Sequence, residues 1–166
     1  MTPSQVVFDC VVYLQAAARA DGPARACLRL VQDGHFVLLI SPAIRAQVED
    51  VLNRPRVRHK FQSLTDEGVA AFLADIDGLA RTVEQVPAAI TLARDPKDEP
   101  YLNLAVSVGA EFLLTWDNDL LHLMEHSPDG KEFRERVPRL AIVTPPAFLE
   151  AMRRRAEGAG ERQRGS

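Results

Sequence analysis

The sequence predicts an α/β fold, a three-layer α/β/α sandwich in which a mainly parallel central sheet lies between helices. Short apolar runs alternate with longer stretches of helical spacing over most of the 166 residues, and this alternation is typical of parallel strands joined by crossover helices. Residues that start helices, a Ser or Thr followed by Pro or acids, come directly after several of these runs. The length suits one domain, and no stretch is long enough to be a linker between two.

The first half of the chain contains two predicted strands and four predicted helices. Pro23 follows the helix breaker Gly22 and is suited to the first position of a new helix. Ser41 and Thr65 are typical N-caps of the two helices that follow. The predicted strands lie at residues 6–8 and 35–40, and the predicted helices at residues 11–20, 23–30, 42–53 and 66–79.

The second half repeats the alternation of strand and helix. Strands are predicted at residues 82–86, 111–115 and 140–143, a helix from Asp98 to Gly109, a short helix after Asp119, and a last helix capped by Thr144. We expect residues 127–138, which contain Pro and Gly, to form a loop. The last helix is expected to fray at residues 153–155 and to lose order beyond Glu157. The predicted domain therefore spans residues 1–152, followed by a disordered Arg- and Gly-rich tail at residues 153–166.

Composition excludes several classes of protein. The chain is 46% hydrophobic and contains two cysteines, too few for a disulfide framework. It contains no apolar run of the roughly 20 residues that span a bilayer, and we expect no leader sequence. We therefore expect a cytoplasmic protein without membrane contact. Residues 153–166 hold five Arg and two Glu, a net charge of +3. Because the whole chain has a net charge of −3, residues 1–152 have a net charge of −6. An acidic body argues against non-specific binding along DNA.

Four acids lie where the chemistry of a parallel sheet is expected. Asp9 and Asp117 each come soon after a predicted strand, Asp98 opens the helix before the second of these strands, and Asp119 follows two residues after Asp117. Ligands of open parallel sheets bind beyond the carboxyl ends of the strands. Clustered carboxylates repel one another, and hard oxygen ligands favour Mg²⁺ or Mn²⁺ as the shared cation. The alternative is that Asp98 and Asp119 only cap helices.

The chain resembles the PIN-domain family, and in particular the toxin components of toxin–antitoxin pairs. The resemblance is carried, in this order, by Val7-Phe8-Asp9, Ser41-Pro42, Val51-Leu52-Asn53-Arg54-Pro55, Arg94-Asp95-Pro96-Lys97-Asp98-Glu99-Pro100-Tyr101-Leu102, Gly109 to Leu121, and Val143-Thr144-Pro145. It implies a PIN-like fold and a metal-dependent endoribonuclease that an antitoxin neutralises, commonly as a homodimer. By position, Asp9, Asp98 and Asp117 are the expected catalytic and metal-binding carboxylates. Asp119 is a further metal ligand, and Thr115 and Gln47 support the site.

Two departures from the family pattern weaken the expected site. The family usually has Thr-Asn after the first Asp, where this chain has Cys10-Val11, and a Glu where this chain has Gln47. Glu49 and Asp50 are expected to face solvent and so to be poor substitutes for that Glu. The alternative function is therefore a catalytically impaired PIN fold that binds RNA or a protein partner. A phosphoryl-accepting receiver domain is disfavoured, because no Lys follows a late strand in a suitable place.

Three further features leave two interpretations each. Four cations, Arg54, Arg56, Arg58 and Lys60, occur within seven residues and either bind RNA phosphates or form a solvated connection between helices. Trp116 either stacks on a nucleotide or shields the site by packing on a neighbouring helix. The pattern from His122 to His126 fits the H-x-x-E-H sequence of a zinc peptidase. A surface helix with two titratable rings is favoured instead, because a zinc site needs a third ligand.

Overall fold

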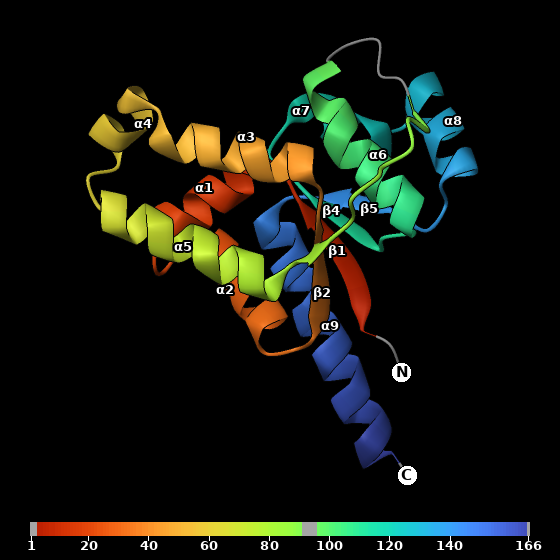
Figure 1. The fold of residues 1–166 in the computed structure, drawn as a ribbon. Helices are drawn as coiled ribbons and strands as arrows, with labels where there is room; N and C mark the ends of the chain where they lie inside the picture. Colours follow the sequence, from red (N-terminus) through yellow and green to blue (C-terminus); the bar gives the residue numbers. More distant parts are fainter. Residues whose placement is uncertain (1–2, 91–95, 166) are drawn as a thin grey trace.

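The computed structural model describes residues 3–90 and 96–165 of the chain and confirms the predicted three-layer α/β/α architecture (Figure 1). Its central sheet has five strands in the order β3-β2-β1-β4-β5, and every neighbouring pair is parallel. The strands are β1 (Ser4–Phe8), β2 (Phe36–Ile40), β3 (Arg81–Thr82), β4 (Phe112–Leu114) and β5 (Ala141–Val143). Every carboxyl end therefore lies at one edge of the sheet.

Helices connect successive strands, and their predicted starts are confirmed at several caps. The Ser41 hydroxyl accepts a hydrogen bond from the Ile44 amide at 3.2 Å, and the Thr65 hydroxyl accepts one from the Gly68 amide at 3.0 Å. The α-helices are α1 (Cys10–Ala18), α2 (Pro23–Gln32), α3 (Pro42–Asn53), α4 (Pro55–Lys60), α5 (Asp66–Leu79), α6 (Glu99–Val108), α7 (Asn118–Leu121), α8 (Pro128–Arg136) and α9 (Pro145–Arg164), with short 3-10 helices η1 (Pro96–Asp98) and η2 (His122–Met124).

The hydrophobic core lies between each face of the sheet and the helices that pack on that face. On one face Phe36 of β2 and Phe112 of β4 pack edge-on against Phe148 of α9, with ring centroids 5.0 and 4.9 Å apart. Phe8 of β1 meets Tyr13 of α1 on the same side, because in-register residues of parallel strands share a face. Helix α6 contacts β1 and β4 from the other side (Figure 1), and η1, which ends at Asp98, directly precedes it.

Residues 127–138 differ from the prediction, because most of them form α8 rather than a loop. The Ser127 hydroxyl caps this helix by accepting a hydrogen bond from the Gly130 amide at 3.1 Å, and Phe133 is buried. Gly130 is needed for close packing rather than for a break, since a Cβ there would lie 2.5 Å from the Glu125 carbonyl oxygen. The Pro and the Gly thus belong to a helix start, which the sequence pattern alone did not distinguish from a loop.

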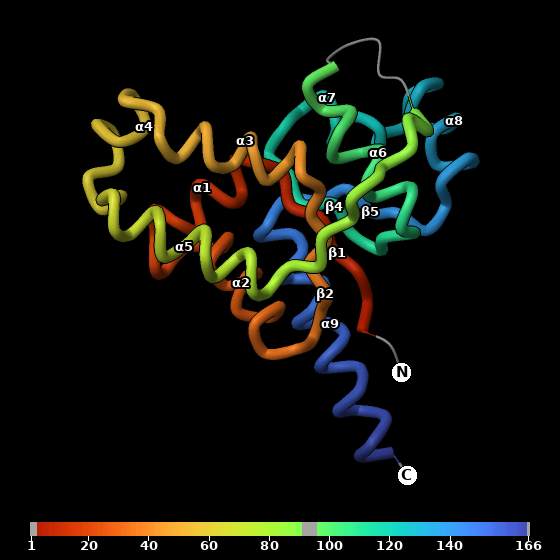
Figure 2. The backbone as a smooth tube through the Cα atoms, viewed as in Figure 1, coloured from red at the N-terminus to blue at the C-terminus, as the bar shows by residue number. Residues whose placement is uncertain are grey.

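The end of the chain also differs from the expectation, since α9 continues to Arg164 instead of losing order beyond Glu157. Arg153 pairs with both Glu150 and Glu157, three and four residues away, and such pairs stabilise a helix on its exposed face. Figure 2 shows this half of α9 projecting from the rest of the fold.

Strand β3 also differs from the prediction, since it is only two residues long and begins at Arg81. No helix in the described part of the chain has the length and apolar character needed to cross a membrane.

Candidate metal centre

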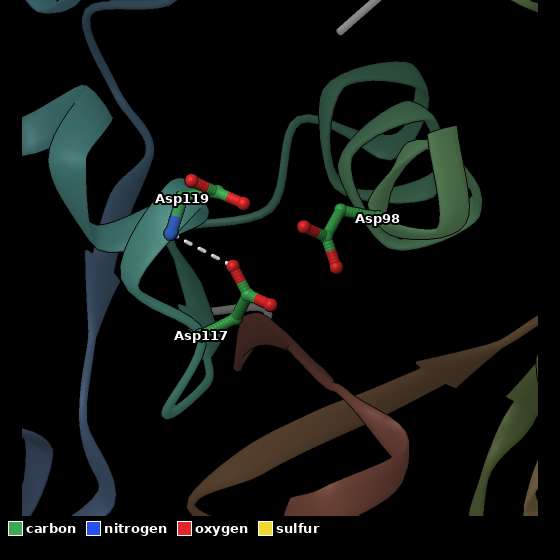
Figure 3. Close-up of side chains that lie close together, drawn as sticks. All are labelled: Asp98, Asp117 and Asp119. Atoms are coloured by element: carbon green, nitrogen blue, oxygen red, sulfur yellow. Dashed lines mark hydrogen bonds between the residues drawn. The ribbon is translucent and has the colours of Figure 1, made fainter. Parts of the chain in front are cut away.

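Three of the four predicted acids meet beyond the carboxyl end of β4. Asp98, Asp117 and Asp119 each present a carboxylate oxygen, and these oxygens lie within 4.8 Å of one another. Figure 3 shows the three side chains directed toward a common space, Asp98 from the start of α6 and the other two from the start of α7. Asp98 is buried, whereas the other two are half-buried. We refer to these three residues as the acidic cluster.

Local backbone geometry explains why the cluster forms. After β4 the chain turns sharply, and the Asp117 carboxylate caps α7 by accepting hydrogen bonds from the amides of Asp119 at 2.8 Å and Leu120 at 3.2 Å. This cap directs the second oxygen of Asp117 and the side chain of Asp119 toward Asp98 (Figure 3). The side chain of Asp98 does not cap α6, so the interpretation of Asp98 as a simple helix cap is not supported.

The structure places Asp9 beside the acidic cluster but not within it. Asp9 follows β1 and caps α1, with its Oδ1 accepting a hydrogen bond from the Val12 amide at 3.0 Å. Only 6% of Asp9 is exposed. Burial raises the pKa of its carboxyl, hydrogen bonds from Thr115, Val12 and Val11 oppose that rise, and the charge of Asp117 adds to it. A role of Asp9 in metal binding therefore stays a prediction.

Thr115 connects Asp9 to the acidic cluster. Its side chain is completely buried, and its hydroxyl donates a hydrogen bond to Asp9 Oδ2 while accepting one from the Asp117 amide at 2.9 Å. The Thr115 amide in turn donates to the Val143 carbonyl of β5 at 3.0 Å. One hydroxyl therefore fixes the positions of two acids that lie 108 residues apart in sequence, 9 and 117.

Gln47 lies at the margin of the site through a contact that the sequence did not reveal. The Tyr101 hydroxyl donates a hydrogen bond to Gln47 Oε1, and Tyr101 also interacts with the Cys10 side chain, which follows Asp9. Burial raises the pKa of Tyr101, so its hydroxyl keeps its proton and acts as a donor. Tyr101 lies in the motif quoted above, one helical turn after Asp98, and this spacing is the signal that would have found it.

Neighbouring acids on α3 do not replace the missing charge at Gln47. Glu49 is paired with Arg45 at 3.0 Å and Asp50 is paired with Arg54 at 2.7 Å, and both carboxylates are exposed. The expectation that they face solvent is confirmed. Arg94 and Asp95, which belong to the same family motif as Asp98, lie outside the described residues.

The four predicted RNA-binding cations lie at and beyond the end of α3, on or next to α4. Figure 1 places α4 away from α6 and α7. Arg58 is committed to internal contacts, with the carbonyls of Leu52 at 2.6 Å and Leu64 at 3.2 Å and with the carboxylate of Asp66 at 2.8 Å. Arg56 and Lys60 are exposed, and Arg54 is exposed but paired with Asp50. Phosphate binding by Arg54, Arg56 and Lys60 stays a prediction, and the contacts of Arg58 favour a structural role.

The H-x-x-E-H segment is not one α-helix. Helix α7 ends at Leu121, His122 begins η2, and His126 lies beyond it. His122 Nδ1 lies 2.9 Å from a carboxylate oxygen of Glu125. Among the described residues, the group of three His, Cys, Asp or Glu side chains that can share a cation is the acidic cluster, and it contains neither histidine.

A family model described as PIN domain matches residues 5–119. The matched region begins in β1 and ends at Asp119, so it includes Asp9 and the whole acidic cluster. No curated protein matches the chain at a significant level.

Proposed function

Because the chain belongs to the PIN-domain family, we propose that it is a metal-dependent endoribonuclease that hydrolyses RNA phosphodiester bonds at the acidic cluster. One observation carries this proposal: carboxylates of Asp98, Asp117 and Asp119 lie within 4.8 Å of one another at the carboxyl edge of the sheet. Three acids at this distance repel one another, and a divalent cation is the natural compensation.

The donor set fits a hard divalent cation. Two oxygens bound to the same Mg²⁺ at about 2.1 Å are at most about 4.2 Å apart, close to the upper limit of 4.8 Å found within the acidic cluster. The described residues put no Cys or His into this cluster, which favours Mg²⁺ or Mn²⁺ over softer metals. When bound, such a cation supplies positive charge for a phosphoryl transition state and lowers the pKa of water.

The residues of the chain have distinct parts in this proposal. Asp98, Asp117 and Asp119 hold the cation. Asp9 extends the negative site, because the Thr115 hydroxyl joins its carboxylate to the Asp117 amide at the acidic cluster. Thr115 holds Asp9 and Asp117 in register through its single hydroxyl.

The biological setting is a finer proposal supported by the motif resemblance. We infer a toxin that a cognate antitoxin protein restrains and that forms a homodimer in the cytoplasm. The acidic body, with a net charge of −6 over residues 1–152, favours a basic inhibitor segment by charge complementarity.

Cleavage of a labelled single-stranded RNA with and without Mn²⁺ tests the activity. We expect wild-type cleavage to require Mn²⁺ and to fall by at least about 100-fold in Asp98→Asn and Asp117→Asn, as for loss of a group that stabilises transition-state charge. Asp75→Asn is the matched control, since Asp75 is an exposed acid on α5 outside the acidic cluster. Metal-independent cleavage, or equal losses in Asp75→Asn, would refute the proposal.

The second candidate, a catalytically impaired binding module, is favoured by the residues at positions 11 and 47. The side chain of Val11 offers no polar atom to the site, and Gln47 supplies a neutral oxygen that already accepts from Tyr101. The double change Val11→Asn with Gln47→Glu separates the two functions. If wild-type protein is inert and the double variant gains Mn²⁺-dependent cleavage, the binding module is correct. If wild-type protein already cleaves RNA, the nuclease is correct.

A further inference from the structure

Two large apolar side chains are exposed on the described surface, and both belong to residues close in sequence to Asp9 or Asp117. Val11 and Trp116 are each 41% exposed, and among the described residues they are the large hydrophobics with such exposure. Val11 follows Asp9 by two positions, and Trp116 lies between Thr115 and Asp117. Single exposed apolar side chains are common on protein surfaces, so what distinguishes these two is their position next to Asp9, Thr115 and Asp117 in the chain.

The indole of Trp116 is exposed but held in one orientation. Its Nε1–H donates a hydrogen bond to Gln15 Oε1 at 2.7 Å. Gln15 and Val11 lie four residues apart on α1, so they share one face of that helix. Hydrogen bonds also fix the backbone on both sides of Trp116. The Thr115 amide donates to the Val143 carbonyl of β5, and the Asp117 amide donates to the Thr115 hydroxyl. The exposed ring is thus preorganised rather than loosely packed.

A fixed aromatic face next to a phosphodiester site matches the chemistry of a nucleobase. Every base presents a flat π-face, and single strands expose these faces for stacking, whereas duplexes cover them. The indole nitrogen is already used by Gln15, which leaves the ring face for stacking and not for base-specific hydrogen bonds.

A pocket at the start of α6 is less suitable for the same strand. It has a volume of about 460 Å³ between the starts of α3 and α6, and its lining includes Glu84 and Glu99. Negative side chains disfavour the approach of a phosphate backbone. The substrate is therefore expected to leave the acidic cluster along α1, over Trp116.

We propose that Trp116 is the stacking platform for the base next to the phosphodiester at the acidic cluster, and that the chain accordingly takes single-stranded RNA. Gln15 positions the ring, and Val11 extends the apolar surface toward Asp9. The choice of nucleic acid as the ligand rests on the proposed function, whereas the stacking itself is measured without cleavage.

Trp116 is the single tryptophan of the chain, so its fluorescence reports directly on this position. We would titrate wild-type protein in Ca²⁺ with a short single-stranded RNA, with an abasic backbone of the same length and with a duplex of the same sequence. Gel analysis confirms that the strands stay intact. We expect saturable quenching by the single-stranded RNA and much weaker quenching by the other two. Equal quenching by the abasic strand, or no quenching at all, would overturn the proposal.

A pair of variants separates stacking from bulk apolar contact. Trp116→Leu keeps an apolar side chain but removes the ring, and Trp116→Phe keeps a ring. From alanine-substitution values for base stacking, we expect Trp116→Leu to weaken binding of fluorescein-labelled RNA by roughly five- to 150-fold, and Trp116→Phe to weaken it much less. Thermal unfolding curves, recorded by circular dichroism, check that both variants fold. Unchanged affinity in folded Trp116→Leu would refute the platform.

The outcomes also distinguish this inference from the nuclease proposal. Base-dependent quenching in a wild-type protein that never cleaves RNA would leave the platform standing and remove the nuclease. Mn²⁺-dependent cleavage with an unchanged KM in Trp116→Leu would leave the nuclease standing and remove the platform.

Discussion

Neutralising Asp119 is expected to change the stability of the protein in opposite directions with and without metal. In the metal-free protein, Asp119→Asn removes the repulsion between this carboxylate and those of Asp98 and Asp117. In the presence of Mn²⁺ the same change removes one of three ligands. The order of the two melting temperatures, wild type and variant, should therefore reverse when Mn²⁺ is added.

The magnitude follows from the spacing of the acidic cluster. Two unit charges at 4.8 Å repel by about 0.9 kcal/mol at the dielectric constant of water, and Asp119 takes part in two such pairs. The helix start of α7 loses a favourable acid, which costs about 0.3–1 kcal/mol. The net gain for the metal-free variant is about 1 kcal/mol, or about 2–4 °C for a chain of this length. Wild-type protein gains about 1.4 kcal/mol when Mn²⁺ is at ten times its Kd.

Differential scanning fluorimetry in EDTA and in a series of Mn²⁺ concentrations measures both effects. The matched control is Asp129→Asn, because Asp129 is an acid in the first turn of α8 and lies outside the acidic cluster. The control should lose a little stability equally in both conditions. The reasoning is refuted if Asp119→Asn melts below wild type in EDTA, or if Mn²⁺ raises its melting temperature as much as that of wild type.

Three further predictions concern the support of the site and of the fold. Thr115→Val keeps the shape of the side chain but removes the hydroxyl that donates to Asp9 and accepts from the Asp117 amide. Urea unfolding should show that the free energy of unfolding falls by about 2 kcal/mol in this variant, and by much less in Thr115→Ser, which keeps the hydroxyl. Tyr13 is fully buried, and its hydroxyl has no hydrogen-bond partner among the described residues, so Tyr13→Phe should be neutral or stabilising in the same measurement. A hydrogen bond from Arg45 lowers the pKa of Asp77 below its ordinary value of 3.8. The ionised carboxylate therefore stabilises the fold fully above pH 3.8, and this stabilisation is lost as the pH falls from 3.8 through the lowered pKa of the folded state. Asp77→Asn should therefore cost less than about 1 kcal/mol at pH 7 because the pair is exposed, and stability measured against pH should show the difference from wild type vanishing below pH 3.8.

The sequence predicted the elements whose signals are local. The caps at Ser41 and Thr65 depend on a side chain and an amide three residues away, so their pattern is visible in a few letters. The convergence of Asp98 and Asp117 was also predictable, because the carboxyl ends of parallel strands share one edge. Both predictions depend only on helix starts and strand direction.

The parts that were missed depend on contacts between distant segments. Helix α8 forms because Gly130 lets the chain pass close to the Glu125 carbonyl, and a Gly in a sequence does not show whether it provides a turn or a close approach. Asp9 is not part of the acidic cluster, and its carboxylate accepts hydrogen bonds from the Thr115 hydroxyl and the Val12 amide. Which of several nearby acids share a cation is decided by such hydrogen bonds, and these are set only in the folded chain.

Gln47 shows how the same kind of contact alters the electrostatics of the site. Its oxygen accepts the Tyr101 hydroxyl, and a Glu at this position would make the same hydrogen bond while adding a charge. Burial and the charge of Asp9 raise the pKa of Cys10, which interacts with Tyr101, while the hydrogen bond with Tyr101 and the charge of Arg54 oppose that rise. Another carboxylate at position 47 would therefore be added beside a group that is buried and already feels the charge of Asp9. With Gln47, position 47 adds no charge to those of Asp9 and the acidic cluster. It is therefore expected to bind a cation more weakly than a site with one more carboxylate, and to lose less stability when no cation is bound.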